Sequence, residues 1–127
     1  MDDSLQYSCG GGKLRQCEFR LVRYVPNAVK EEFINIGVVF IDHDSVTVRF
    51  TSNWDRVRNF DESADIEMLK TIEAELRQRL SQGGKYQDGA FADLQDRCSN
   101  ALQFTERKAC LCTDAERELE SLVSLYL

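Results

Sequence analysis

The chain has 127 residues, 43% of them hydrophobic and 30% charged, a composition typical of one globular domain with its own core. Sixteen basic against 22 acidic side chains give a net charge of −6, which argues against binding nucleic acid or anionic lipid over the whole surface. No apolar stretch reaches the ~20 residues of a membrane helix, and the acidic N-terminus is not a secretory signal. We therefore expect a cytoplasmic protein that does not enter a membrane.

The first half of the chain predicts three consecutive strands. Residues 1–13 are polar and contain three consecutive glycines, so we expect a flexible leader before a single domain over 14–127. Residues 17–25 predict a strand with one apolar side, ended by Pro26 and Asn27. Residues 33–41 are apolar on both faces and predict a central strand, in which Gly37 indicates a bulge or a close backbone approach.

A short turn over 42–45 connects to a third strand over 46–51, antiparallel to the second. Its alternation separates inward Val46, Val48 and Phe50 from outward Thr47, Arg49 and Thr51.

The second half is predicted to be largely helical. We expect a short helix over 54–60, a helix over 64–82 that residues 61–63 cap and Gly83 ends, and a short helix over 91–98. The apolar stripe of the longer helix consists of Leu69, Ile72, Leu76 and Leu80.

Residues 102–112 predict one strand or a weak hairpin, with Leu102, Phe104, Ala109 and Leu111 inward. Thr113 and Glu116 match a capping box for a last helix. The stripe of that helix consists of Ala115, Leu119, Leu122, Val123 and Tyr126. It continues to Leu127 without a C-cap, which fits either a natural end or a cut chain. Together the elements predict an α+β fold: an antiparallel meander with one late strand or hairpin, and helices packed on one face.

The polar residues beside the only proline form the first candidate site, which comprises Arg23, Tyr24, Glu31, Glu32 and Asn35. An asparagine in a buried strand needs hydrogen-bond partners, and an arginine on an apolar strand face needs a counter-charge, for which Glu31 or Glu32 is suited. A structural network that fixes the hairpin is the favoured interpretation. A pocket for a ligand or partner is the functional one, and a small-molecule enzyme built on Arg23, Glu32 and Asn35 is a third.

Charge is unevenly distributed along the chain. Residues 13–58 carry eight basic and six acidic side chains, whereas residues 59–127 carry eight and fourteen. The cationic half supplies a candidate anion-binding set, which comprises Arg20, Arg49, Arg56 and Arg58. A solvated face with local ion pairs is the simpler interpretation.

Other candidate chemistry is weaker. His43 lies in a turn with no nucleophile motif near it, and the carboxylates around it lack a nuclease pattern. Five cysteines, an odd number, without paired zinc-ligand spacing predict reduced thiols packed as small apolar groups. Trp54 beside Arg56 could stack on a base, but a core position is favoured. We therefore expect no metal and no cofactor.

Residues 19–42, FRLVRYVPNAVKEEFINIGVVFID, resemble the opening signature of a bacterial family without assigned activity, the domain-of-unknown-function family numbered three thousand and thirty-seven. Its Arg-Tyr-x-Pro and Glu-Phe-x-Asn-Ile-Gly-Val strands are matched by Arg23, Tyr24, Pro26, Glu32, Phe33, Asn35, Ile36, Gly37 and Val38. Residues 101–126 are similar to the family's close, a polar strand followed by a capped helix. The resemblance implies a small bacterial cytosolic protein, and the association of some members with genes for HipA-like kinases implies an accessory or partner role. It carries over no catalytic residues.

Since no catalytic constellation is recognisable, the sequence favours a non-enzymatic interaction or accessory module that binds a protein partner or a second copy of itself. A nucleic-acid- or phosphate-binding or -processing domain that uses the cationic half is the alternative.

Overall fold

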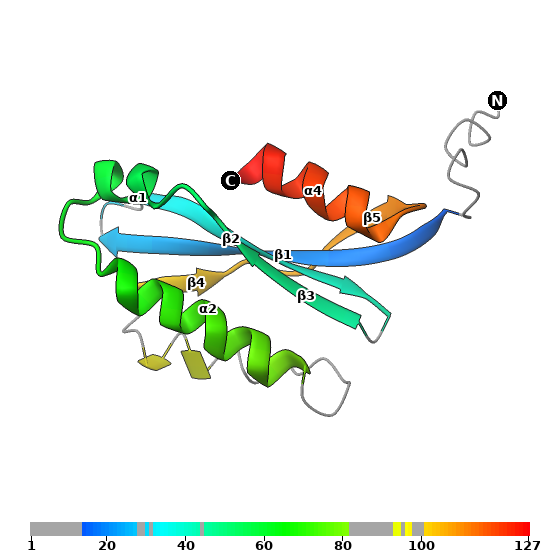
Figure 1. Ribbon diagram of the computed structural model, residues 1–127, viewed down its shortest axis with the longest axis horizontal. Helices are drawn as coiled ribbons and strands as arrows, with labels where there is room; N and C mark the ends of the chain where they lie inside the picture. Colours follow the sequence, from blue (N-terminus) through cyan, green and yellow to red (C-terminus); the bar gives the residue numbers. More distant parts are fainter. Residues whose placement is uncertain are drawn as a thin grey trace.

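The computed structural model describes residues 14–27, 30, 32–43, 45–81, 93–94, 96–97 and 101–127. Its elements are, in chain order, β1 (Arg15–Asn27), β2 (Glu32–Asp42), β3 (Ser45–Phe50), α1 (Trp54–Phe60), α2 (Ile66–Ser81), β4 (Leu102–Phe104), β5 (Lys108–Cys112) and α4 (Ala115–Tyr126). The predicted leader over 1–13, Glu31, Gly83 and most of the helix expected over 91–98 lie outside the described residues. The fold is α+β with an antiparallel sheet, as the sequence predicted (Figure 1).

The sheet is built around β1, which has partners on both edges. β1, β2 and β3 form the expected meander, and β4 and β5 both pair antiparallel with the other edge of β1. β4 lies opposite residues 22–24 and β5 opposite residues 15–19, so the two follow each other along the same edge. Residues 102–112 therefore form one interrupted strand and not a hairpin.

The interruption at 105–107 reverses the side-chain faces of the late strand. Val22 lies opposite Phe104, whereas Cys17 lies opposite Cys110, so the register slips by one residue between them. A one-residue slip turns every later side chain to the other face. The prediction that Ala109 and Leu111 face inward was therefore wrong: both are exposed, and Cys112 is buried instead.

The helices cover both faces of the sheet, which corrects the prediction that they pack on one face. In Figure 1 α2 and α4 lie on opposite sides of the strands. β1 and β2 carry apolar side chains on both faces, so each face requires a cover. The core on the α2 side includes Val22, Tyr24, Ile36, Val39, Val48, Phe50, Leu69, Ile72 and Leu76. The core on the α4 side includes Cys17, Phe19, Leu21, Val38, Phe40, Cys112, Leu119 and Leu122.

Both predicted features of Gly37 are present. Ile36 is an extra residue in β2, because Val22 lies opposite Gly37 and the next residue of β1 lies opposite Asn35. A Cβ at Gly37 would lie 2.6 Å from Cδ1 of Phe50, so only glycine leaves room for that ring. Thr51, predicted to point outward, is buried, and its amide donates to the Ile36 carbonyl at 2.8 Å.

The end of β1 and the caps of α2 and α4 differ from the predictions by a few residues. β1 continues past Pro26 to Asn27, with the proline in an irregular stretch of the pairing. α2 has the predicted buried stripe, but Asp65 accepts from the Met68 amide at its start, where residues 61–63 were expected to act. α4 is capped by Asp114 and not by Thr113. Trp54 packs beside Phe50 against the α2-side core, as favoured.

Candidate functional site

The end of the β1–β2 hairpin brings Arg23 and Asn35 together. The two residues lie opposite each other, and Arg23 Nε donates to Asn35 Oδ1 at 3.4 Å. Val22 and Tyr24 contribute to the α2-side core, so Arg23, between them, points to the α4 side. Arg23 and Asn35 thus bond directly to each other and join β1 to β2 at this point.

Besides Asn35, the guanidinium of Arg23 contacts an aromatic ring; of the two predicted carboxylates, Glu31 lies outside the described residues. The guanidinium carbon of Arg23 lies 4.2 Å from the centroid of the Phe33 ring, which is within cation–π range. Glu32 is exposed, and the described part of the chain shows no ion pair between it and Arg23. Phe33 is 45% exposed, so the stacked pair of Arg23 and Phe33 is available at the surface.

Arg56 on α1 adds a second cation at this point. Its Nη2 donates to the main-chain oxygen of Asn35 at 2.7 Å. Its Nε is buried and has no hydrogen-bond acceptor among the described residues. We refer to Arg23, Phe33, Asn35 and Arg56 as the hairpin-end site. Its two guanidinium groups and its aromatic ring are suited to a carboxylate and an apolar group of a partner.

Tyr24 lies on the other face and does not join the hairpin-end site. Its hydroxyl donates to Asp61 Oδ2 at 2.6 Å. Burial, together with this bond, raises the pKa of Tyr24 to about 12. The same bond, with further donation from Ser63, lowers the pKa of Asp61. Tyr24 therefore connects the sheet to the segment between α1 and α2.

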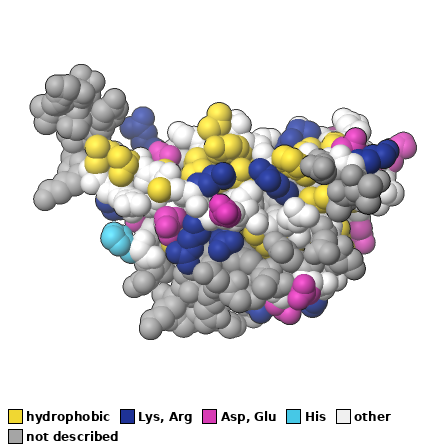
Figure 2. All heavy atoms as spheres, turned by 180° about the vertical axis from the view of Figure 1, so that it is seen from behind, with side chains coloured by type: hydrophobic (Ala, Val, Ile, Leu, Met, Phe, Trp, Pro, Cys, Tyr) yellow, Lys and Arg dark blue, Asp and Glu magenta, His cyan; other side chains and the backbone are white. Residues whose placement is uncertain are grey.

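The four arginines of the predicted anion-binding set are not brought together. Arg20 lies opposite Val39 of the α2-side core, and Arg49 lies opposite Val38 of the α4-side core, so they project from opposite faces. Arg20 donates to the Thr105 carbonyl at 3.0 Å, Arg49 binds Glu120 at 2.8 Å and Arg58 binds Asp55 at 3.2 Å. Figure 2 shows basic and acidic side chains intermixed on the face seen from behind.

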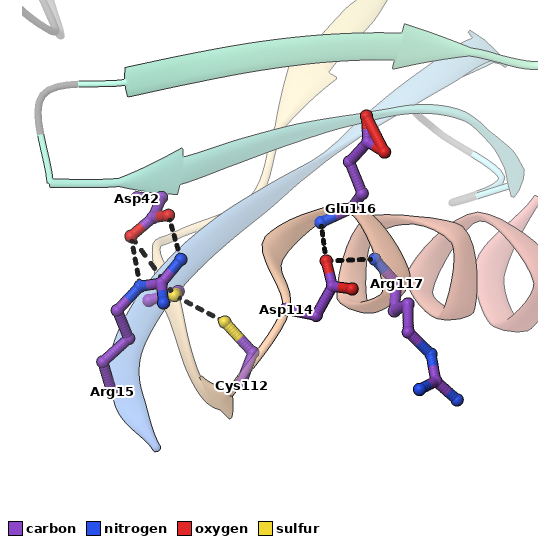
Figure 3. Close-up of polar contacts among 7 residues, drawn as sticks. Arg15, Asp42, Cys112, Asp114, Glu116 and Arg117 are labelled. Carbon is purple, nitrogen blue, oxygen red and sulfur yellow. Dashed lines mark hydrogen bonds and ion pairs between the residues drawn. The ribbon is translucent and has the colours of Figure 1, made fainter. Parts of the chain in front are cut away.

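A second polar cluster connects the far ends of β1 and β2 (Figure 3). Arg15 donates to both carboxylate oxygens of Asp42, with Nε–Oδ1 at 3.0 Å and Nη2–Oδ2 at 2.7 Å. This bidentate bond lowers the pKa of Asp42. Cys17 contacts the same carboxylate, with its Sγ 3.7 Å from Oδ1. The sequence pattern did not predict this cluster, although the opposite charges of Arg15 and Asp42 at the open end of the hairpin were a usable signal.

The neighbourhood of that cluster does not resemble a metal centre. His43 follows Asp42 in the turn, is exposed and has a φ of 57°. Throughout the described ranges, no group of three or more His, Cys, Asp or Glu side chains could hold a metal ion. None of the described helices combines the length and the apolar character needed to cross a membrane.

The fold and these two clusters define a small α+β domain in which Arg15, Arg20 and Arg49 bond to groups of the chain itself. The sequence model of the family described as protein of unknown function (DUF3037) matches residues 19–127, so the chain belongs to this family. The resemblance seen in the hairpin and the last helix is thus confirmed. A search of curated proteins and a search of solved structures gave no significant match.

Proposed function

We propose that this chain is a non-enzymatic protein-interaction module and that the hairpin-end site is its contact surface. The observation that supports this most is the convergence of Arg23 and Arg56 on Asn35 beside the exposed ring of Phe33. Aromatic residues and arginines are enriched where protein interfaces derive most of their binding energy. The site is also held in place before binding, because β1, β2 and α1 each supply part of it.

The chemistry of the site defines the partner segment. A carboxylate of the partner would replace water at the two guanidinium groups, and an apolar or aromatic side chain would cover Phe33. As the partner we propose a HipA-like kinase from the same bacterial cytoplasm, the class that the family resemblance implied. The chain would then act as an accessory protein of that kinase.

The alternative of nucleic-acid or phosphate binding is less well supported by the geometry. It required Arg20 and Arg49 on a common face, and these two project from opposite faces. Backbone recognition of nucleic acid depends on several cations along one surface. A single site at Asn35 fits a local acidic group of a protein better than a continuous phosphate chain.

The test is a binding titration between the full chain and a purified HipA-like kinase encoded in the same genome. Phe33→Ala and Arg23→Ala should each weaken the complex by roughly tenfold or more, because hot-spot truncations cost on the order of 2 kcal/mol. Met68→Ala, which removes an exposed apolar side chain from α2, is the matched control and should bind like the wild type.

Unchanged affinity for both hairpin-end variants would contradict the proposed surface, and absence of any complex would contradict the proposed partner. Salt-dependent binding to single-stranded RNA or DNA that is lost in the Arg20→Ala, Arg49→Ala double variant would instead support the alternative.

A further inference from the structure

Two buried thiols face each other between β1 and β5. Cys17 Sγ and Cys112 Sγ are 2.9 Å apart, and both residues are almost fully buried in the α4-side core. Both are free cysteines. Figure 3 shows the sulfur of Cys112 pointing toward the group around Arg15 and Asp42. A contact this short between two sulfurs places them close to bonding distance, with a small movement still required.

The backbone pairing alone does not select this pair of sulfurs. Cys17 lies directly opposite Cys110, whereas Cys112 lies opposite Arg15, one step further along the face. Cys110 is only half-buried, and the sulfur that contacts Cys17 nevertheless belongs to Cys112. Cys112 is the last residue of β5, and α4 begins three residues later. A bond at this position would therefore attach both β5 and the start of α4 to β1.

We propose that Cys17 and Cys112 are a redox-sensitive pair that closes reversibly into a disulfide. With hydrogen peroxide as the oxidant, the thiolate of one cysteine attacks a peroxide oxygen, the O–O bond breaks, and a sulfenic acid and hydroxide form. The second sulfur then displaces the sulfenic oxygen, which leaves as water after protonation, and the S–S bond forms. In total the two thiols lose two electrons and two protons, and one peroxide is reduced to two waters.

The surroundings determine how readily the pair reacts. Burial, followed by the contact with Cys112, raises the pKa of Cys17 to about 12. Its thiol is thus protonated at neutral pH, where it lies beside the carboxylate of Asp42. Since the thiolate is the reactive form, the pair should stay reduced in ordinary buffer and close slowly under excess peroxide. Closure removes the thiol donor from Asp42 but leaves both bonds from Arg15.

The experiment treats the purified full chain with hydrogen peroxide, alkylates the remaining thiols and maps the peptides by mass spectrometry. We expect one cross-linked species that joins the Cys17 and Cys112 peptides, lighter than their sum by two hydrogen atoms. Closing a long loop should raise Tm by on the order of 5–10 °C, and dithiothreitol should reverse the rise.

Two variants keep the result interpretable. A variant with Cys9, Cys98 and Cys110 replaced by serine retains only the proposed pair, and it should show the same cross-link and the same Tm shift. Cys112→Ser should lose both effects while its reduced form still unfolds cooperatively. The proposal is overturned if Cys17 and Cys112 are both alkylated after peroxide treatment, or if Cys17 is found joined to Cys110. It is also overturned if the variant that retains only the pair forms no intramolecular disulfide.

Discussion

Tyr24 and Asp61 connect the central strand to the α1–α2 segment through a hydrogen bond of 2.6 Å. The tyrosine is buried in the α2-side core, so its hydroxyl depends on this carboxylate for a partner. Tyr24→Phe should therefore lower the free energy of unfolding by about 1–2 kcal/mol, measured by urea denaturation. Tyr126→Phe is the control, because the described contacts of Tyr126 are ring packing with Phe19, and it should change stability by less than about 0.5 kcal/mol. Equal effects of the two substitutions would contradict the assigned role of the bond.

The same contact predicts a change in stability at alkaline pH. The folded state keeps the Tyr24 proton up to a pKa of about 12, whereas an unfolded tyrosine loses its proton near pH ~10. A raised pKa stabilises the fold fully below the unfolded value, and this stabilisation is lost as pH rises through the folded value. The stability difference between wild type and Tyr24→Phe should hence shrink between pH ~10 and about 12. A difference that stays constant across this range would show that the hydroxyl is not held protonated.

A single methyl group added at Gly37 should lower the stability of the protein, because the Phe50 ring packs directly against this glycine. A Cβ there would lie 2.6 Å and 2.8 Å from two carbons of the Phe50 ring. Gly37→Ala should destabilise the protein by about 1–3 kcal/mol, because the ring has to move within a packed core. The penalty should be smaller in a Phe50→Leu background, and a double-mutant cycle measures this coupling. Additive effects would mean that the ring is not what excludes the methyl group.

Side chains of α2 protect the outer edge of β3. Arg77 Nε donates to the Val48 carbonyl at 3.1 Å, and Glu73 accepts from the Phe50 amide at 3.4 Å. β3 ends the described sheet order, and an uncovered edge of this kind can pair with another chain. Arg77→Ala should therefore promote concentration-dependent self-association, detected by size-exclusion chromatography with light scattering. Lys70→Ala removes the same charge from the same helix and should remain like the wild type; association of both variants would point to net charge instead.

The sequence predicted the elements whose signals are local. The two apolar faces of residues 33–41 and the stripe from Leu69 to Leu80 depend on periodicity alone, and both were confirmed. The slip at 105–107 could not be foreseen, because it depends on how two separate strand pieces fit along β1. The sequence also contained the reason for helices on both faces, namely a central strand without a polar side, but it did not say which helix covers which face.

The hairpin-end site, too, could be predicted from the sequence only in part. The sequence predicted that Asn35 needs a hydrogen-bond partner and that Arg23 needs a carboxylate, and the structure joins Arg23 and Asn35 to each other. The sequence pattern indicated a carboxylate as the partner of Arg23 and gave no signal for Phe33, two residues from Asn35 on the same strand face. Arg56 belonged to the predicted anion-binding set and not to the predicted hairpin site. Its contact with Asn35 depends on where α1 packs relative to the hairpin, which local sequence patterns do not reveal.

Thr113 and Asp114 are equally suited by residue type to cap α4, and the structure shows that Asp114 is the cap. The Asp114 side chain accepts from the amides of Glu116 at 3.1 Å and Arg117 at 3.4 Å, as Figure 3 shows. Asp114→Ala should cost about 1 kcal/mol of unfolding free energy, since it removes the acceptor for two otherwise unpaired helix amides. Thr113→Ala leaves this acceptor in place and should cost less than about 0.5 kcal/mol. Thermal denaturation followed by circular dichroism measures the loss of stability in each variant. A larger loss for Thr113→Ala than for Asp114→Ala would show that Thr113 is the N-cap, as the capping-box pattern indicated.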